Sequence, residues 1–241
     1  MTLSIAEEVD GCSQLVWERL MAKTRYGRYA DAVESKMVFY ALDRQRTPGT
    51  LLDIGCEGGR WSKLFADRGW QVTALDIDAE VLRICKERIK TACCTLVTPN
   101  EQRFPVPDES VDIALCIEVG PVIHRPWAIG EFARALKRGG RLVGVCWNRS
   151  SWRGVLYHSA PALRTTGSDP LVGFPIRYLD FKTRMQEHGF RFERESGYAW
   201  GPFRRTSNSP WMSMWAAVET YTGLQSLIRF SPMVAFACQK L

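Results

Sequence analysis

One strand that ends in a glycine-rich turn and leads into a helix limits what this chain can fold into more than any other feature. Residues 50–56 (TLLDIGC) form an apolar run of the kind expected for a buried strand. The turn that follows holds three glycines: Gly55, Gly58 and Gly59. A helical repeat then runs from Trp61 to Gly69. Such a turn lets a ligand approach the backbone, and the free amides of the helix favour an anion, although tight packing alone also explains the glycines.

Strands and helices continue to alternate after this turn. Two later segments repeat apolar side chains at helical spacing, and a third ends at Gly189: residues 79–90, 127–137 and 181–188. Gly139-Gly140 is expected to end the second of these helices. Further strands are predicted at residues 71–76, 93–97, 111–117, 141–147, 190–198 and 233–239. Because apolar strands joined by helices form parallel sheets covered on both faces, we predict an α/β fold with a doubly wound, mostly parallel, seven-stranded sheet.

The length of 241 residues suits one such domain with added segments. Residues 1–48 are predicted to form a helical amino-terminal cap, and residues 49–241 the main domain. Two segments rich in Trp, Pro and Ser lie outside the predicted sheet, at about 150–179 and 200–232. We expect both to cap a substrate site, the second as an insertion before the last strand.

Charge and hydropathy limit which binding partners and which cellular compartment are expected. The net charge of +6 is spread along the chain, so nucleic-acid binding is not expected. No run of about eighteen apolar residues occurs, so no membrane span is expected. The start of the sequence is acidic and lacks an apolar leader, which predicts no signal peptide and a cytoplasmic protein.

The cysteines and histidines predict neither disulfides nor a metal site. Five of the eight cysteines fall in apolar runs and are expected to be buried and reduced: Cys93, Cys94, Cys116, Cys146 and Cys238. No two cysteines have the separation found in zinc knuckles, and the three histidines lie far apart in the sequence.

Asp76 strengthens the interpretation of the glycine turn as a ligand site. It closes the second predicted strand about twenty residues after the turn, where a carboxylate can accept hydrogen bonds from both hydroxyls of a ribose. This spacing fits a nucleoside-containing cofactor. It does not separate NAD from S-adenosylmethionine.

Asp53 and the order of later segments resemble the class I S-adenosylmethionine-dependent methyltransferases. These enzymes carry an acid on the first strand before the turn, whereas NAD sites place their first glycine differently and need no acid there. LVTPNEQRFPVPDESVDIALC is similar to the family's segment from the third to the fourth strand, EFARALKRGGRLVGVCW to its fifth strand and the preceding helix, and LDFKTRMQEHGFRF to the helix and strand that follow. The resemblance covers residues 50–147 and, less closely, later strands. It implies a Rossmann-like domain that binds S-adenosyl-L-methionine.

The resemblance assigns roles around the methionine part of this cofactor. Asp53 would order the turn and approach the methionine amino group, either directly or through water. Gly55 and Cys56 would offer backbone contacts, and Ile117 would direct its carbonyl to the ammonium group. Glu57 replaces a glycine of the family's pattern, which the turn can accommodate if its side chain faces outward.

Four further positions would bind the adenosine part. Asp76 would hold the ribose hydroxyls, and Ile77 would pack on the adenine. Asn100 and Glu101 stand where the family has an acid followed by a small residue beside the adenine. Asn100 thus departs from the usual aspartate, and we expect it to bind the amino group or the ring of adenine.

Methyl transfer from a sulfonium is an in-line displacement, so the protein mainly aligns the nucleophile and excludes water. A general base helps only when the acceptor is a hydroxyl or a protonated amine. His124, in the loop EVGPVIHRP after the fourth predicted strand, is the predicted catalytic base, and Glu118 is a weaker candidate. The alternative for His124 is a loop histidine that caps the next helix or faces water.

The acceptor site is expected to come from the added segments. Their aromatic side chains either form a lid over the cofactor or simply pack the added helices onto the sheet: Tyr26, Tyr29, Phe39, Tyr40, Trp200, Phe203, Trp211, Trp215 and Tyr221. This apolar character predicts O- or N-methylation of a small or medium organic metabolite. A tRNA or protein methyltransferase and a non-catalytic cofactor-binding regulator are the alternatives, and a homodimer stays open. A NAD-dependent oxidoreductase would need a proton relay that the sequence does not display.

Overall fold

The computed structural model describes residues 15, 18, 23–159 and 173–241. Their strands are β1 (Thr50–Ile54), β2 (Gln71–Asp76), β3 (Cys93–Leu96), β4 (Val111–Cys116), β5 (Leu136–Trp147), β6 (Phe190–Tyr198) and β7 (Met233–Lys240). Their helices are α2 (Arg25–Asp43), α3 (Arg60–Ala66), α4 (Ala79–Arg88), α5 (Gly120–Ile123), α6 (Pro126–Ala135), α7 (Trp152–Ser159), α8 (Tyr178–Glu187), α9 (Trp211–Tyr221) and the short 3-10 helix η2 (Leu224–Ser226).

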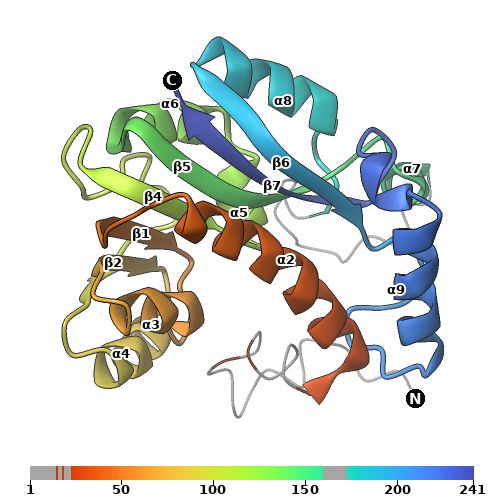
Figure 1. Cartoon of the computed structure of the whole chain (residues 1–241), viewed down its shortest axis with the longest axis horizontal. Helices are drawn as coiled ribbons and strands as arrows, with labels where there is room; N and C mark the ends of the chain where they lie inside the picture. Colours follow the sequence, from red (N-terminus) through yellow and green to blue (C-terminus); the bar gives the residue numbers. More distant parts are fainter. Residues whose placement is uncertain (1–14, 16–17, 19–22, 160–172) are drawn as a thin grey trace.

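The strands form one seven-stranded sheet in the order β3-β2-β1-β4-β5-β7-β6 (Figure 1). Neighbouring strands from β3 to β5 run parallel, and β7 runs antiparallel to both β5 and β6. The predicted α/β fold with a doubly wound, mostly parallel sheet is confirmed. The order reverses between β1 and β4, which is the point at which open α/β sheets bind ligands.

Helices cover both faces of the sheet. Leu51 and Leu52, adjacent on β1, belong to two different buried clusters, because successive side chains of a strand point to opposite faces. The cluster of Leu51 includes side chains of α2 and α4 together with Phe65 of α3, and the cluster of Leu52 includes side chains of α6 and α8. Strands buried on both faces explain why the sequence displays continuous apolar runs.

The glycine pair Gly139-Gly140 does not end a helix, and that prediction was wrong. Helix α6 ends at Ala135, and β5 begins at Leu136, so both glycines lie inside the strand. Gly139 adopts a φ of 81°, and a Cβ on Gly140 would lie 2.9 Å from the carbonyl oxygen of Lys137. The two glycines therefore form an irregular start of β5, where its register with β4 shifts.

The added segments contain helices that the sequence patterns did not reveal. Helices α7 and α9 lie within the two segments rich in Trp, Pro and Ser, and α9 packs against α2. Much of the first predicted cap segment, residues 160–172, lies outside the described residues, as does most of residues 1–22. No helix in the described ranges is long and apolar enough to cross a membrane.

The cysteine prediction holds for the central strands and fails at the edge. Cys116, Cys146 and Cys238 are buried and free. Cys93 is exposed and Cys94 is half-buried, because β3 is an edge strand of the sheet. The apolar run at this edge did not signal how little of the strand is covered.

Asn148 links the end of β5 by hydrogen bonds to the segment before β7 and to the start of α8. Its side chain is fully buried, and Nδ2 donates to the carbonyl oxygens of Arg229 at 2.8 Å and Ser231 at 3.0 Å. Its Oδ1 accepts from the amides of Ser150 and Tyr178, each at 3.1 Å. One side chain thus joins β5, the approach to β7 and the start of α8.

We predict that Asn148→Ala lowers the free energy of unfolding by about 3 kcal/mol, because it leaves several buried backbone groups without partners. Urea denaturation followed by tryptophan fluorescence measures the change. Arg149→Ala is the matched control: the Arg149 side chain is exposed, and its replacement should cost less than about 0.5 kcal/mol. Equal stabilities of the two variants would show that Asn148 is not a structural link.

Candidate functional site

The carboxyl ends of β1, β2 and β4 bring the predicted cofactor residues to one edge of the sheet. Gly55 follows β1, Asp76 ends β2, and Ile117 follows β4. Register pairs Ile54 with Leu75 at this edge, so the turn after β1 and the end of β2 lie side by side. Four predicted positions that are far apart in the sequence thus share one edge, since Asn100 follows the neighbouring strand β3.

The backbone of the turn is held by the second strand. The amides of Gly55 and Cys56 both donate to the carbonyl oxygen of Leu75, at 2.8 and 3.0 Å. These amides are therefore not free to bind a ligand. The Gly55 carbonyl oxygen accepts no hydrogen bond from a described residue, so the backbone contact that this residue can offer is to a donor such as an ammonium group. Gly55 has a φ of 66°, and a Cβ there would lie 2.5 Å from Cγ2 of Val119.

Glu57 occupies a position whose conformation favours glycine. Its φ is 48°, in the left-handed region. Its amide donates to Oδ2 of Asp76 at 2.9 Å, and its own Oε2 accepts from the amide of Glu18 at 3.3 Å. The charge-assisted bond to Asp76 explains how the chain tolerates a side chain at this position.

Asp76 is a half-buried carboxylate surrounded by backbone donors. Besides the amide of Glu57, its oxygens accept from the amides of Ile77 at 2.8 Å and Asp78 at 3.1 Å. The side chain of Ile77 is 62% exposed, which is unusual for a large aliphatic residue at the end of a buried strand. The Asp76 carboxylate, a hydrogen-bond acceptor, thus lies next to the exposed apolar side chain of Ile77.

Asn100 and Glu101 lie in an exposed turn after β3, next to Asp76. The amide of Val97 donates to the carbonyl oxygen of Asp76 at 3.0 Å, which joins the two strand ends. Oε2 of Glu101 accepts from the amide of Thr98 at 3.3 Å and so supports the turn. The Asn100 side chain is exposed at this edge.

Asp53 lies behind the turn rather than in front of it. Its side chain is buried, and Oδ2 accepts from the amide of Ser62 at 3.1 Å and from its hydroxyl at 2.7 Å. Burial raises the pKa of Asp53 to about 6, although both bonds from Ser62 oppose this shift. The carboxylate binds the first turn of α3 and is 3% exposed.

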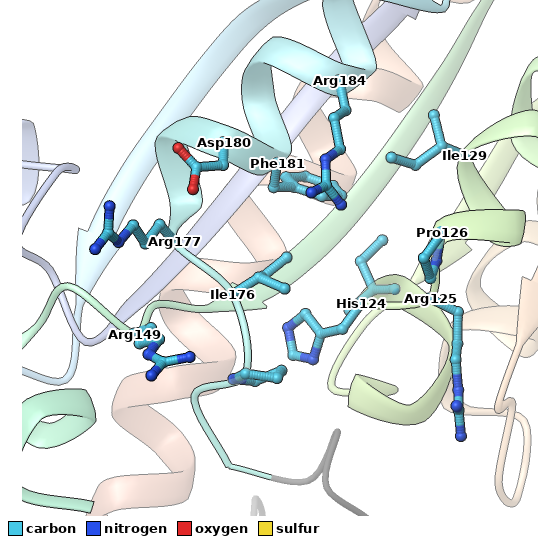
Figure 2. A pocket seen from close by; sticks show the side chains of 12 residues that line it. His124, Arg125, Pro126, Ile129, Arg149, Ile176, Arg177, Asp180, Phe181 and Arg184 are labelled. Atoms are coloured by element: carbon cyan, nitrogen blue, oxygen red, sulfur yellow. The ribbon is translucent and has the colours of Figure 1, made fainter. Parts of the chain in front are cut away.

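His124 is buried and points into a cavity between α5, α6 and α8 (Figure 2). Its Nε2 accepts a hydrogen bond from the amide of Trp147 at 3.1 Å. This cavity has a volume of about 340 Å³ and is lined by several arginines, among them Arg149 and Arg184. The arrangement gives His124 a structural partner at Nε2 and favours a positioning role over the predicted catalytic one.

Glu118 belongs to a buried polar cluster that sequence reasoning did not reveal. Its side chain forms an ion pair with Arg205 and accepts from the ring nitrogen of Trp147 at 3.2 Å and the hydroxyl of Tyr198 at 3.3 Å. Glu34 of α2 approaches the same hydroxyl at 3.4 Å, and its pKa is raised by burial and by the charge of Glu118. No short-range sequence signal joins residues so far apart in the chain.

A cavity of about 260 Å³ lies against this cluster. We refer to it as the aromatic cavity, and its aromatic and charged lining residues are Tyr26, Trp147, Tyr157, Phe174, Arg153 and Arg205. It shares no lining residue with the cavity of His124. The ring of Trp147 connects it to Glu118, two residues after β4, and so to the edge that carries Gly55.

Of the nine aromatic residues for which the sequence left a lid and simple packing open, Tyr26 alone is among the described lining residues of the aromatic cavity. Trp211 and Tyr221 are 62% and 89% exposed, and Phe203 packs on Trp215 instead. Tyr29 binds Glu219 through its hydroxyl and so joins α2 to α9. The structure thus supports the packing alternative for Tyr29, Phe203 and Trp215, whereas Trp211 and Tyr221 are exposed.

A family model matches the part of the chain that forms this edge, and curated relatives match less than half of the chain. The family model described as "Methyltransferase domain" matches residues 52–144. An uncharacterized chloroplastic methyltransferase of Arabidopsis thaliana is 35% identical over 117 residues, which are 43% of this chain and 32% of the relative. A ubiquinone biosynthesis O-methyltransferase of Idiomarina loihiensis is 32% identical over 112 residues, 42% of this chain and 44% of the relative. The chain thus spans less than half the length of both relatives.

Solved structures with the same fold cover nearly all of the chain. Geranyl diphosphate C-methyltransferase from Streptomyces coelicolor, in complex with S-adenosyl-L-homocysteine, superposes with a TM-score of 0.60 at 16% identity and covers 100% of this chain and 88% of its own. A possible histamine N-methyltransferase from Thermotoga maritima has a TM-score of 0.59 at 18% identity, over 93% and 95% of the two chains. Residues 52–144 thus match a methyltransferase domain, and the whole chain has the fold of these S-adenosylmethionine-dependent methyltransferase structures.

Proposed function

We propose that this protein transfers the methyl group of S-adenosylmethionine to an oxygen or nitrogen atom of a small or medium organic acceptor. The observation that carries the proposal is the position of the Asp76 carboxylate beside the Gly55 turn at the switch point of the sheet. The bound cofactor supplies a methyl group already activated by a positively charged sulfur. The residues of the chain therefore need to hold both partners in line and exclude water.

At the adenosine end, Asp76 accepts a hydrogen bond from the ribose. A carboxylate has about four acceptor positions, and backbone amides use three of those on Asp76, so one stays open for a hydroxyl. The exposed side chain of Ile77 packs on the adenine, and Asn100 and Glu101 border it from the turn after β3.

At the methionine end, carbonyl oxygens bind the ammonium group. Gly55 and Ile117 follow adjacent strands, and no described residue donates to either carbonyl oxygen. Cys56 contributes through backbone atoms of the same turn, and Asp53 keeps the turn and α3 in register from behind. The residues present thus fit a group that carries an ammonium and a ribose.

The aromatic cavity is the proposed acceptor site, because it adjoins the carboxyl edge through Trp147 and Glu118. Its volume of about 260 Å³ suits a small metabolite better than a macromolecular acceptor. Four of its nine described lining residues are aromatic, which supports an organic acceptor over tRNA. A tRNA or protein acceptor and a non-catalytic regulator remain the rival functions; a cytoplasmic location and a homodimer also remain predictions.

We predict that Asp76→Ala weakens binding of S-adenosylhomocysteine by about 1 to 3 kcal/mol, because it removes an acceptor for the ribose. Isothermal titration calorimetry measures this change. Asp76→Asn separates two contributions, since it retains an oxygen for the turn but lacks the charge. Thermal melting of each variant shows whether the fold is intact.

Asp67→Asn is the matched control for this experiment. Asp67 is an exposed carboxylate at the far end of α3, paired with Lys63, and its replacement should leave cofactor affinity unchanged. Wild-type affinity in Asp76→Ala would remove Asp76 from the site. A wild-type protein that binds NAD and not S-adenosylhomocysteine would overturn the proposed function.

We predict that His124→Ala lowers stability by about 1 to 3 kcal/mol, because the buried amide of Trp147 loses its acceptor. Turnover with an identified acceptor should fall less than about tenfold, since alignment is the main task of the protein. Denaturation and steady-state kinetics on the same preparations measure both effects. A loss of about a hundredfold or more in kcat by a stably folded variant would instead identify His124 as a general base.

A further inference from the structure

Arg153 of α7 carries a charge for which the described residues provide no ion pair. Its Nε donates to the carbonyl oxygen of Ala199 at 3.1 Å, and its Nη2 donates to the carbonyl oxygens of Gly201 and Phe203. These bonds fix the guanidinium in place, and its carbon lies 4.9 Å from the ring centre of Trp152. Neutral carbonyls satisfy its donors without neutralising its charge.

The surroundings make this charge costly. Arg153 lines the aromatic cavity together with the rings of Tyr26, Trp147 and Tyr157. Burial lowers the pKa of Arg153, which reflects the loss of water around the guanidinium. A cation in an apolar setting is unfavourable unless an anion accompanies it.

The other charged groups at the cavity do not supply that anion. Arg205 is paired with Glu118, so these two charges compensate each other. Glu219 attracts Arg153 through its charge, but the two side chains form no ion pair, and the Glu219 carboxylate binds the hydroxyl of Tyr29 and the amide of Trp200 instead. Glu34 has a raised pKa in the buried cluster beyond. The described wall of the aromatic cavity thus presents one positive charge without a paired carboxylate.

The donors of Arg153 leave room for a ligand. The bonds to carbonyl oxygens use Nε and Nη2, and Nη1 donates to no described group. A guanidinium fixed by such bonds can bind a carboxylate with little further loss of side-chain freedom. The aromatic rings on the same wall favour a flat, apolar body on that ligand.

We propose that the methyl acceptor is a small acid with an aromatic or similarly flat body, and that Arg153 binds its carboxylate in the aromatic cavity. This inference rests on the proposed function, because it takes the aromatic cavity as the acceptor site. One carboxylate matches the guanidinium of Arg153, which has no ion pair on the described wall of the aromatic cavity. The volume of about 260 Å³ suits a molecule with a single ring system.

The test compares acids with their neutral amides on the whole protein saturated with S-adenosylhomocysteine. The probes are benzoate, 4-hydroxybenzoate and indole-3-acetate, each paired with the corresponding amide. We expect at least one acid to bind about tenfold or more tightly than its amide, by calorimetry or ligand-observed NMR. Arg153→Met should abolish this preference, and Arg153→Lys should retain part of it.

Arg149→Met is the control, because Arg149 is an exposed arginine that lines the separate cavity of His124. It should leave the preference for acids unchanged. S-adenosylhomocysteine binding and thermal melting report whether each variant is folded. If Arg153→Met does not fold, two other measurements test the role of Arg153: the affinities of the wild-type protein for acids and amides, and the same affinities in Arg153→Lys.

The outcomes separate this inference from the function on which it rests. Loss of S-adenosylhomocysteine binding by the wild-type protein would overturn the proposed function itself. Normal cofactor binding with no acid bound more tightly than its amide would overturn the role of Arg153 and leave methyl transfer standing. A preference for acids that persists in Arg153→Met would place the carboxylate elsewhere.

Discussion

The turn after β1 is held by the end of β2, and the rest of the site depends on this connection. The carbonyl oxygen of Leu75 accepts two turn amides, and the Asp76 carboxylate accepts the amide of Glu57. The turn cannot open without breaking bonds to a strand that is itself fixed in the sheet. A residue held in the left-handed region costs of the order of 1 to 3 kcal/mol, and the charge-assisted bond offsets part of this cost at Glu57. The same hydrogen bonds thus fix the shape of the turn and the position of the Asp76 carboxylate.

A second network, centred on Glu118 after β4, assembles the proposed acceptor side. Glu118 is almost fully buried, and its partners come from the end of β5, the end of β6 and the segment before α9. Removing one partner of a buried ion pair typically costs about 3 to 5 kcal/mol, because a charge is left without compensation. The wall of the aromatic cavity therefore forms only when the carboxyl-terminal part of the chain has folded onto the sheet.

Sequence patterns predicted those features of the fold that depend on residues close together in the sequence. The strand at residues 190–198 has the predicted bounds, because its pattern is local. Gly139-Gly140 was assigned to the end of a helix, since a glycine pair ends a helix as readily as it distorts a strand. The pairing of β5 with β4, which places both glycines in a strand, is not visible in the sequence. Arg153 and Arg205 went unnoticed because they meet in one cavity across about fifty residues of sequence. Periodicity carries no information on such contacts.

The two halves of the site consequently respond differently to substitution. The proposed cofactor half lies at strand ends and includes backbone carbonyl oxygens, whose positions the sheet itself fixes. The proposed acceptor half consists of side chains whose positions depend on partners far away in the sequence. Trp147 shows the coupling: His124 binds its backbone amide, and Glu118 binds its ring. A change at His124 therefore moves a wall of the aromatic cavity without touching a ligand, so acceptor preference can change while cofactor binding is retained.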